Sequence, residues 1–302
     1  MTPGVLIVAG PTASGKTKLA IELARRFEAE IVGADSRQIY RGMPVGTAAP
    51  SPEELRAIRH HLIGFLDPSE RYSAAAFVRD ALAAIDGVHA RGKRSIVVGG
   101  TGFYIRALCG DVEMAGERDE GLRSRLAHEA LVHPPEVMHD WLSALDPKRA
   151  AALYAEDRYR VMRALEIALA QRLGREPKEI ARENLRSRGI PFVKTYLEVP
   201  ETELEQRIAA RVEWMLQGGL IEEAERLGTS AVAADAVGYP QALAYLRGFS
   251  TQPELRTQLM RATRRYAKRQ ATWFRSEPGL TRISGDLLAQ LIAVARTIPG
   301  WA

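Results

Sequence analysis

Short apolar runs alternate with segments of helical spacing through the first third of the chain. The runs at 5–9, 30–34 and 94–98 predict buried strands. Apolar residues three or four positions apart predict helices after the first run and at 73–91. A helical pattern also covers 53–61, after a turn-rich connection at 42–52. Strands that alternate with helices indicate βαβ units and a parallel sheet.

The pattern changes near Gly116. From 118 to 188 helical patterns recur without a convincing strand, with breaks at 133–135, 146–147 and 174–177. A strand at 192–199 resumes the α/β pattern, followed by a long helix interrupted or bent at 218–219, a loop at 231–240, a helix at about 253–274 and a short last helix. We therefore predict an α/β core formed by 1–115 and 190–302, with a helical insertion at 116–189.

The composition is that of an ordinary soluble globular protein. The chain has 302 residues, of which 46% are hydrophobic and 26% charged. Its net charge of +5 favours an anionic partner, although only weakly. The single cysteine, Cys109, excludes an intrachain disulfide and a zinc site built on cysteines. We find no signal-peptide pattern and no apolar run of membrane-spanning length, and we expect a cytoplasmic monomer with no membrane association.

A glycine-rich loop lies between the first strand and the helix that follows it. Its sequence is Gly10, Pro11, Thr12, Ala13, Ser14, Gly15, Lys16 and Thr17. The strand, loop and helix together are the context that makes this pattern a P-loop rather than a chance glycine turn. Backbone N–H groups and Lys16 suit phosphate oxygens, and the Thr17 hydroxyl suits Mg²⁺. The sequence therefore predicts a P-loop NTPase-like parallel sheet that binds a di- or triphosphate.

Of the other two strands predicted in the first third of the chain, one is followed by a carboxylate and the other lacks the acid that usually ends such a strand. Most P-loop ATPases end an apolar strand in an acid that helps to hold Mg²⁺, but the run at 94–98 ends in a second glycine turn, 99–102, which includes Thr101. Asp35, which follows the run at 30–34, is the only obvious acid beside the P-loop; a helix cap or turn aspartate is the structural alternative. His60 and His61 do not suggest a metal site, because adjacent side chains on a helix point in different directions.

The last long helix carries a basic face. At about 100° per residue, its basic side chains fall on one face roughly 140° wide. They are Arg261, Arg264, Arg265, Lys268, Arg269 and Arg275. No acid occurs between Arg256 and Ser276, which favours a phosphate backbone as the partner over an ordinary solvated face. A weaker basic concentration, at 158–163, lies in the insertion, and Arg207 or Arg211 could reach the P-loop anion from the helix after the fourth strand.

Several segments, in sequence and in order, resemble the tRNA dimethylallyltransferases over almost the whole chain. They are G-P-T-A-S-G-K-T at 10–17, D-S-R-Q-I-Y at 35–40, G-G-T-G-F-Y at 99–104, R-A-L-E-I at 163–167, G-Y at 238–239 and Y-A-K-R-Q-A-T-W-F-R at 266–275. Many nucleotide enzymes share the first segment, whereas the combination with D-S-x-Q, G-G-T-G and A-K-R-Q is specific. Glu156 stands where the family usually has asparagine.

This resemblance implies transfer of a dimethylallyl group from its diphosphate to N6 of the adenosine 3′ of the anticodon. It implies a P-loop that holds the prenyl diphosphate with Mg²⁺ on Thr17, and a mobile insertion that contacts the anticodon stem-loop. The implied catalytic residues are Asp35 as the base, with Thr101 and Arg211 at the leaving group and Arg207 as the alternative arginine. The implied tRNA contacts are Asp35, Ser36, Arg37, Gln38, Arg160, Arg163, Gly238, Tyr239, Arg265, Lys268, Arg269 and Gln270. No protein partner is implied.

Two other functions share part of this pattern. A P-loop kinase for a small molecule or nucleotide would share the loop, Asp35 and a helical lid, but it would not need the basic helix. An RNA-binding protein with a vestigial P-loop would not need an intact Lys16, Thr17 and Asp35. The combination of segments favours the prenyltransferase.

Overall fold

The chain divides into two compact units, each described by itself. The computed structural model describes residues 3–112, 119–175, 183–229 and 231–301. The core unit comprises Met1–Val112 and Glu183–Ala302, and the helical unit comprises Glu113–Arg182. The predicted start of the insertion, at 115/116, lies outside the described residues. Its predicted end at 189 differs from the structure, because the N–H of Leu185 donates to the carbonyl of Leu108 at 2.8 Å and ties 183–189 to the core unit.

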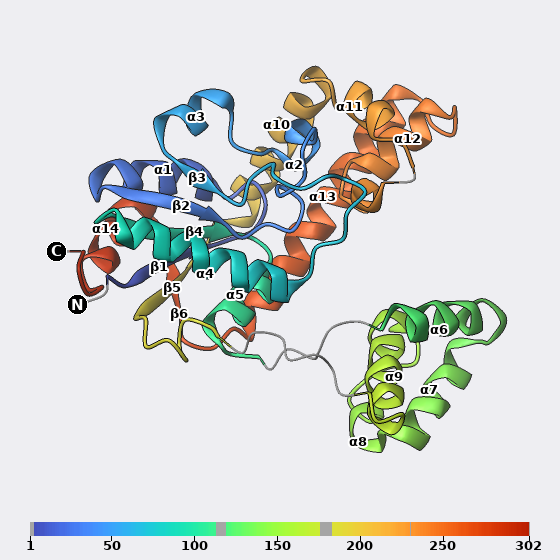
Figure 1. Cartoon of the computed structure of the whole chain (residues 1–302). Helices are drawn as coiled ribbons and strands as arrows, with labels where there is room; N and C mark the ends of the chain where they lie inside the picture. Colours follow the sequence, from blue (N-terminus) through green and yellow to red (C-terminus); the bar gives the residue numbers. More distant parts are fainter. Residues whose placement is uncertain (1–2, 113–118, 176–182, 230, 302) are drawn as a thin grey trace. The chain divides into compact units, whose positions relative to one another are not determined.

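A six-stranded sheet, in which every pair of neighbours is parallel, forms the centre of the core unit (Figure 1). Its strands are β1 Val5–Ala9, β2 Ala29–Gly33, β3 His60–His61, β4 Arg94–Gly99, β5 Phe192–Leu197 and β6 Leu280–Ile283, in the order β3-β2-β4-β1-β5-β6. The predicted α/β fold with a parallel sheet is confirmed. Because β1 lies between β4 and β5, the loop that follows β1 emerges at the middle of the carboxyl edge, where open α/β sheets bind ligands.

Helices cover both faces of the sheet and extend beside it. They are α1 Lys16–Arg26, α2 Pro44–Thr47, α3 Pro52–Ala57, α4 Ala74–Ala90, α5 Gly102–Cys109, α10 Glu201–Gln217, α11 Leu220–Leu227, the 3-10 helix η1 Val232–Asp235, α12 Tyr239–Leu246, α13 Gln252–Arg275 and α14 Leu287–Ala295. Helices α1 and α14 pack on one face, where Leu6 and Val8 join their apolar cluster. Helices α4 and α5 lie on the other face, while α10 to α13 form a second cluster with its own core (Figure 1).

The structure corrects three predicted elements. The helix predicted at 53–61 ends at Ala57, and His60 and His61 instead pair with β2 as the short edge strand β3. Strand β6 was not predicted, since Thr281 and Arg282 in its middle are exposed and break the apolar pattern. The loop predicted at 231–240 contains η1 and the start of α12.

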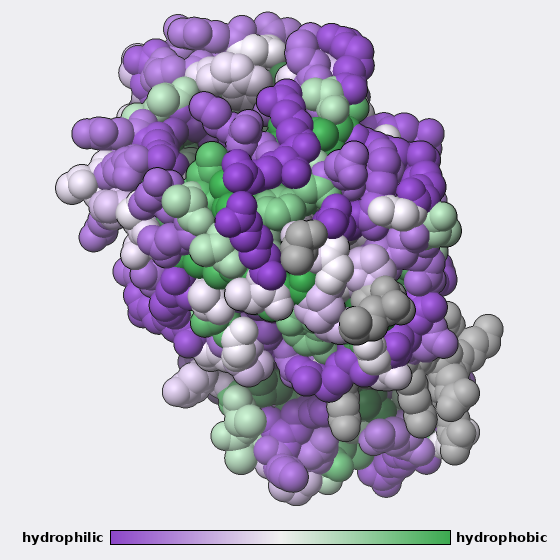
Figure 2. Space-filling model, turned by 90° about the vertical axis from the view of Figure 1, so that its left-hand side faces the viewer, coloured by the Kyte–Doolittle hydropathy of each residue, from purple (hydrophilic) through white to green (hydrophobic). Residues whose placement is uncertain are grey.

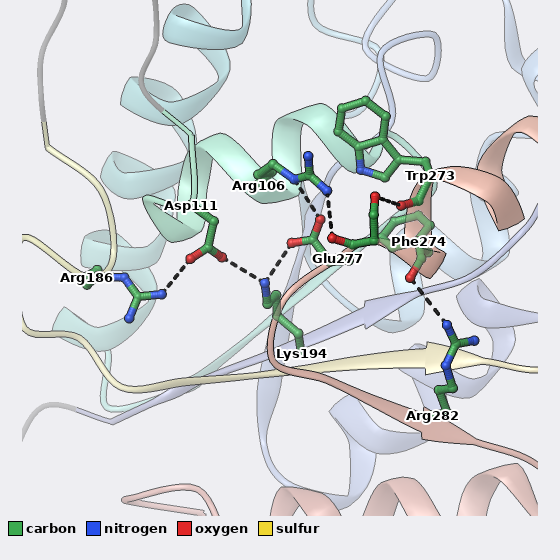
Figure 3. A network of polar contacts seen from close by, with 9 residues as sticks. Arg106, Asp111, Arg186, Lys194, Trp273, Phe274, Glu277 and Arg282 are labelled. Carbon is green, nitrogen blue, oxygen red and sulfur yellow. Dashed lines mark hydrogen bonds and ion pairs between the residues drawn. The ribbon is translucent and has the colours of Figure 1, made fainter. Parts of the chain in front are cut away.

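A network of buried charges ties three segments to β5 (Figure 3). Lys194 of β5 has 3% of its side chain exposed, and its Nζ donates to Asp111 Oδ2 at 2.8 Å and to Glu277 Oε1 at 2.7 Å. Arg106 of α5 donates to the other Glu277 oxygen at 2.9 Å, and Arg186 to Asp111 at 2.6 Å. Each buried charge therefore meets an opposite charge, which offsets its desolvation. The network fixes the end of α5, the chain that returns from the helical unit and the segment after α13.

The helical unit has its own small core. Its helices are α6 Glu120–Val132, α7 Pro135–Leu145, α8 Pro147–Ala150 and α9 Arg158–Arg172. Leu126, Leu142, Val161 and Leu165, among others, pack together in its interior. Asp119 and Asp157 cap α6 and α9, since their carboxylates accept N–H groups of the first turns. Over residues 119–175 the unit contains helices and turns but no strand.

Figure 2 shows hydrophilic residues over most of one face, with hydrophobic residues gathered in smaller patches between them. Across the described ranges, none of the helices is both long enough and apolar enough to span a membrane.

Candidate active site

The P-loop adopts a bent backbone between β1 and α1. Gly15 has a φ of +84° and Ala13 a φ of +64°, both in the left-handed region, and the N–H of Ser14 donates to the carbonyl of Pro11 at 3.2 Å. The hydroxyl of Ser14 is buried, and no described residue hydrogen-bonds it. A buried polar atom without a partner is costly, so this hydroxyl suits a bound polar group. Helix α1 begins at Lys16, which places its positive end at the loop.

Lys16 lies inside this loop. Its Nζ donates to the carbonyl of Pro11 at 3.2 Å. Burial lowers the pKa of Lys16 to about 8, while the charge of Asp35 opposes this effect and that of Arg211 adds to it. Lys16 and Arg211 are therefore two buried cations close to each other, and an anion bound between them would offset their desolvation and mutual repulsion.

One cavity brings nine of the predicted site residues together. Its volume is about 190 Å³. Among the predicted residues, it is lined by Thr12, Lys16, Asp35, Ser36, Arg37, Gln38, Arg211, Arg269 and Gln270. These nine residues come from the P-loop, from the segment after β2, from α10 and from α13, so they reach the site from four separate parts of the chain.

Asp35 follows β2 in a tight turn that its own carboxylate holds. The N–H groups of Arg37 and Gln38 donate to Asp35 Oδ1, at 2.9 and 3.4 Å. The structure gives Oδ2 no hydrogen bond from any described residue, which leaves this oxygen for a ligand. Thr101 stands behind the turn, where its Oγ1 accepts the N–H of Ser36 at 3.0 Å, and it is not among the residues that line the cavity.

Two arginines of α10 reach the site by different routes. Arg211 lines the cavity and donates from Nη2 to the carbonyl of Thr47 at 3.2 Å, and burial lowers its pKa. Arg207 donates from Nη1 to the carbonyl of Ser14 at 2.8 Å and pairs with Glu203 at 2.6 Å. Only Arg211 therefore presents its charge to the cavity beside Lys16, while Arg207 supports the loop.

Gln270 joins the P-loop to the second glycine turn. Its Oε1 accepts the N–H of Thr12 at 2.8 Å, and its Nε2 donates to the carbonyl of Gly100 at 3.0 Å. A Cβ at position 100 would lie 2.1 Å from this Nε2, so a larger residue there would displace the Gln270 amide. The side chain is 5% exposed. Its predicted role as a tRNA contact is thus less consistent with its position than a role as a link between the two loops.

The basic face of α13 is exposed, as predicted, but one of its charges is paired. Arg264 lies 3.5 Å from Glu205 of α10. Arg265 and Lys268 are exposed and have no carboxylate within 4.0 Å among the residues described. Arg269 lies over the ring of Tyr266, 5.5 Å from its centroid, and both line the cavity. The basic residues of α13 therefore extend from the exposed surface, at Arg265 and Lys268, to the cavity, at Arg269.

Other predicted tRNA contacts lie elsewhere. Tyr239 is completely buried, and its hydroxyl donates to Glu223 at 2.7 Å, so its side chain belongs to the core beside α11. Gly238 precedes it with a φ of +110°. In the helical unit, Arg160 is exposed and pairs with Asp157, whereas Arg163 pairs with the buried Glu166.

Sequence reasoning did not identify several polar residues of the cavity, among them Asp235 and Thr47. Asp235, at the end of η1, and Thr47, at the end of α2, both line it. Tyr266 lines the same cavity. Neither a strand end nor a periodic pattern marks Asp235, so the sequence alone offers no signal for it.

The residues near the P-loop include donors that fit a hard divalent cation. Thr17 and Asp35 line a second, smaller cavity of about 20 Å³ next to Lys16. A hydroxyl and a carboxylate are oxygen ligands of the kind that Mg²⁺ takes together with phosphate oxygens. Within the described part of the chain, no cluster of three or more His, Cys, Asp or Glu residues could hold a metal by itself.

Comparison with known proteins identifies the family. The family model described as IPP transferase matches residues 38–277, and the one described as isopentenyl transferase matches residues 3–69. A tRNA dimethylallyltransferase from Anaeromyxobacter sp. (strain K) is 45% identical over 285 residues, which cover 93% of this chain and 92% of the relative. One from Geobacter sulfurreducens is 40% identical, with coverages of 91% and 90%.

Solved structures agree with this result. A tRNA isopentenylpyrophosphate transferase from Bacillus halodurans matches with a TM-score of 0.68 and 35% identity, and it covers 97% of this chain and 94% of its own. A eukaryotic dimethylallyltransferase, whose structures show it acting on tRNA, matches with a TM-score of 0.76 and 27% identity over 97% of this chain and 78% of its own. The chain belongs to the tRNA dimethylallyltransferase family, as the sequence predicted.

Proposed function

We propose that this member of the family transfers a dimethylallyl group from dimethylallyl diphosphate to N6 of the adenosine 3′ of the tRNA anticodon. The observation that supports this function is that Lys16, Asp35 and Arg211 line one cavity. Two cations and the P-loop suit a diphosphate, and a carboxylate beside them suits an acceptor that must lose a proton. The relatives are transferases, and none of the comparisons favours the kinase alternative.

Asp35 acts on the acceptor. An adenine N6 amine is a weak nucleophile because its lone pair is delocalised into the ring. As the bond from N6 to C1 of the dimethylallyl group forms, N6 loses a proton, and the Oδ2 oxygen of Asp35 accepts it. The bond from C1 to the diphosphate oxygen breaks in the same reaction, and diphosphate leaves with the electron pair. The turn that fixes Oδ1 leaves Oδ2 to face this proton.

The P-loop and two cations act on the donor. The diphosphate gains negative charge as it leaves, so N–H groups and cations placed beforehand lower the barrier. Lys16 and Arg211 supply the charges, and the buried hydroxyl of Ser14 supplies a donor. We propose that Thr101 acts through Ser36, whose N–H it accepts, and thereby keeps Asp35 in place.

Mg²⁺ is the divalent ion that we propose for this site, with the hydroxyl of Thr17 as its protein ligand. When bound, it would neutralise part of the charge on the diphosphate.

The exposed basic side chains bind the RNA. Arg265, Lys268 and Arg269 would contact phosphates next to the cavity, and Arg160 would contribute from the helical unit. We propose that the helical unit contacts the anticodon stem-loop. The target base must leave the stack of the loop to reach Asp35, as it does in other enzymes that modify bases.

Incubation with radiolabelled dimethylallyl diphosphate and unmodified tRNA, with and without ATP, tests this function. We expect label in the tRNA without ATP. Phosphoryl transfer from ATP with no labelled tRNA would show that the function is wrong.

A further inference from the structure

Arg37 and Asp235 form an ion pair beside the active cavity. Arg37 comes from the turn after β2, and Asp235 is the last residue of η1. Arg37 Nη1 lies 2.7 Å from one carboxylate oxygen of Asp235, and Nη2 donates to the other at 3.0 Å. Both residues line the cavity that contains Asp35. The pair therefore joins two separate segments at the site where the acceptor base must bind.

This pair is open to solvent. The side chain of Arg37 is 33% exposed, and that of Asp235 is 68% exposed. Exposed pairs of this kind change an equilibrium by only about two- to five-fold, because water competes for both charges. The buried pairs around Lys194 are different, since Lys194 is 3% exposed and Glu277 not at all. The pair at the cavity can therefore exchange partners at low cost.

An RNA phosphate offers Arg37 the same geometry as a carboxylate. Two oxygens of either group accept the two parallel N–H groups of a guanidinium. Arg37 and the exposed Arg269 line the same cavity. An acid at this position repels phosphates unless it is compensated, so its presence in an RNA-binding site needs a reason.

We propose that Asp235 occupies the phosphate-binding position of Arg37 in the free chain, and that an RNA phosphate replaces it when tRNA binds. Asp235 is then a specificity-determining residue, because it offsets the attraction of Arg37 for any polyanion that does not reach the cavity. This inference rests on the proposed function, since its partner is RNA. The exchange leaves Asp35 in place, because the backbone N–H of Arg37, rather than its side chain, holds Asp35 Oδ1.

The inference predicts the sign of one substitution. Asp235→Asn removes the competing carboxylate, so we expect unmodified tRNA to bind about two- to five-fold more tightly at low salt, the range that an exposed pair supports. The salt dependence should also become steeper, because no freed carboxylate takes up a cation when RNA binds. Binding of dimethylallyl diphosphate should not change.

A double-mutant cycle tests the exchange. Dissociation constants for tRNA are measured over a range of salt for the wild type, Asp235→Asn, Arg37→Ala and the double variant. Glu225→Gln, an exposed acid on α11 outside the cavity, controls for the change in net charge. We expect Asp235→Asn to tighten binding beyond the control and to lose this excess when Arg37 is alanine.

Three results would overturn the inference: weaker binding by Asp235→Asn, an effect no larger than that of Glu225→Gln, or the same effect with and without Arg37. If any of these occurs while the wild type incorporates label into tRNA, the inference alone fails. A wild type that neither binds tRNA nor incorporates label refutes the proposed function and the inference with it.

Discussion

Replacing Gln270 with leucine tests whether the link between the two glycine loops holds the active site together. Leucine has a similar volume, but it can neither accept nor donate the two hydrogen bonds that the Gln270 amide makes. The N–H of Thr12 and the carbonyl of Gly100, bonded at 2.8 and 3.0 Å, lose their hydrogen bonds. Because Gln270 is 5% exposed, little water can replace it.

The expected loss is large for one residue. Each buried backbone group left without a partner costs about 1–3 kcal/mol, so the two together cost about 2–6 kcal/mol before the structure relaxes. A domain of ordinary stability has only about 5–15 kcal/mol in total. Gln270→Glu separates the two bonds, because a carboxylate still accepts from Thr12 but cannot donate to Gly100. It should be less stable than the wild type, because its second oxygen meets the carbonyl oxygen of Gly100 without a proton between them.

Urea unfolding measures this loss, with the slope of the transition checked for constancy. Gln258→Leu is a matched control, since Gln258 is an exposed glutamine of the same helix, and it should shift stability by less than about 0.5 kcal/mol. Titration with dimethylallyl diphosphate should show weaker binding by Gln270→Leu, because the P-loop loses its support at Thr12. A loss below about 1 kcal/mol, or one equal to that of Gln258→Leu, would refute a role of Gln270 as a structural link.

Three other predictions concern the chemistry and the RNA. Asp35→Asn should lower single-turnover transfer by about 10²–10⁴-fold and leave tRNA affinity within about two-fold; retained activity would mean that Asp35 is not the base. Lys268→Ala should reduce the salt slope of tRNA binding by about 0.9, while Arg256→Ala, whose arginine pairs with Glu213, should change it less; equal slopes would return Lys268 to an ordinary solvated role. Since the pKa of Lys16 is about 8 in the free chain, affinity for dimethylallyl diphosphate should be highest below that pH and fall above it as the charge is lost; constant affinity from pH 7 to about 10 would contradict this.

The parts of the fold that depend on local pattern could be predicted from the sequence. Strand β4, for example, was expected at 94–98 and found at Arg94–Gly99, and the last long helix at about 253–274 is α13, Gln252–Arg275. Apolar periodicity and turn residues depend on neighbouring positions only, so they can be recognised in a single sequence. Strand β6 was not predicted, because its middle is exposed and it forms by pairing with β5, which is distant in sequence.

The parts of the site that depend on distant contacts could not be predicted. Gln270 was expected to bind tRNA because it lies in a specific segment, yet its partners Thr12 and Gly100 are far away in sequence. Tyr239 shares a segment with Gly238, but its burial follows from Glu223 on another helix. Asp235 and Arg37 are 198 positions apart in the chain, and their pairing depends on how η1 lies against the turn that follows β2. Sequence motifs identify which residues matter more readily than they identify what each residue touches.

The charge network around Lys194 of β5 also bears on the origin of the helical unit. Asp111 precedes that unit and Arg186 follows it, and their side chains lie 2.6 Å apart. The chain thus leaves the core and returns to it at one point, which Lys194 fixes in place. A short linker in place of 113–182 should therefore close the core without strain, as a domain inserted into a surface turn allows. The helical unit is in this respect an exchangeable module, and selection could lengthen or replace it without altering the sheet that carries the chemistry.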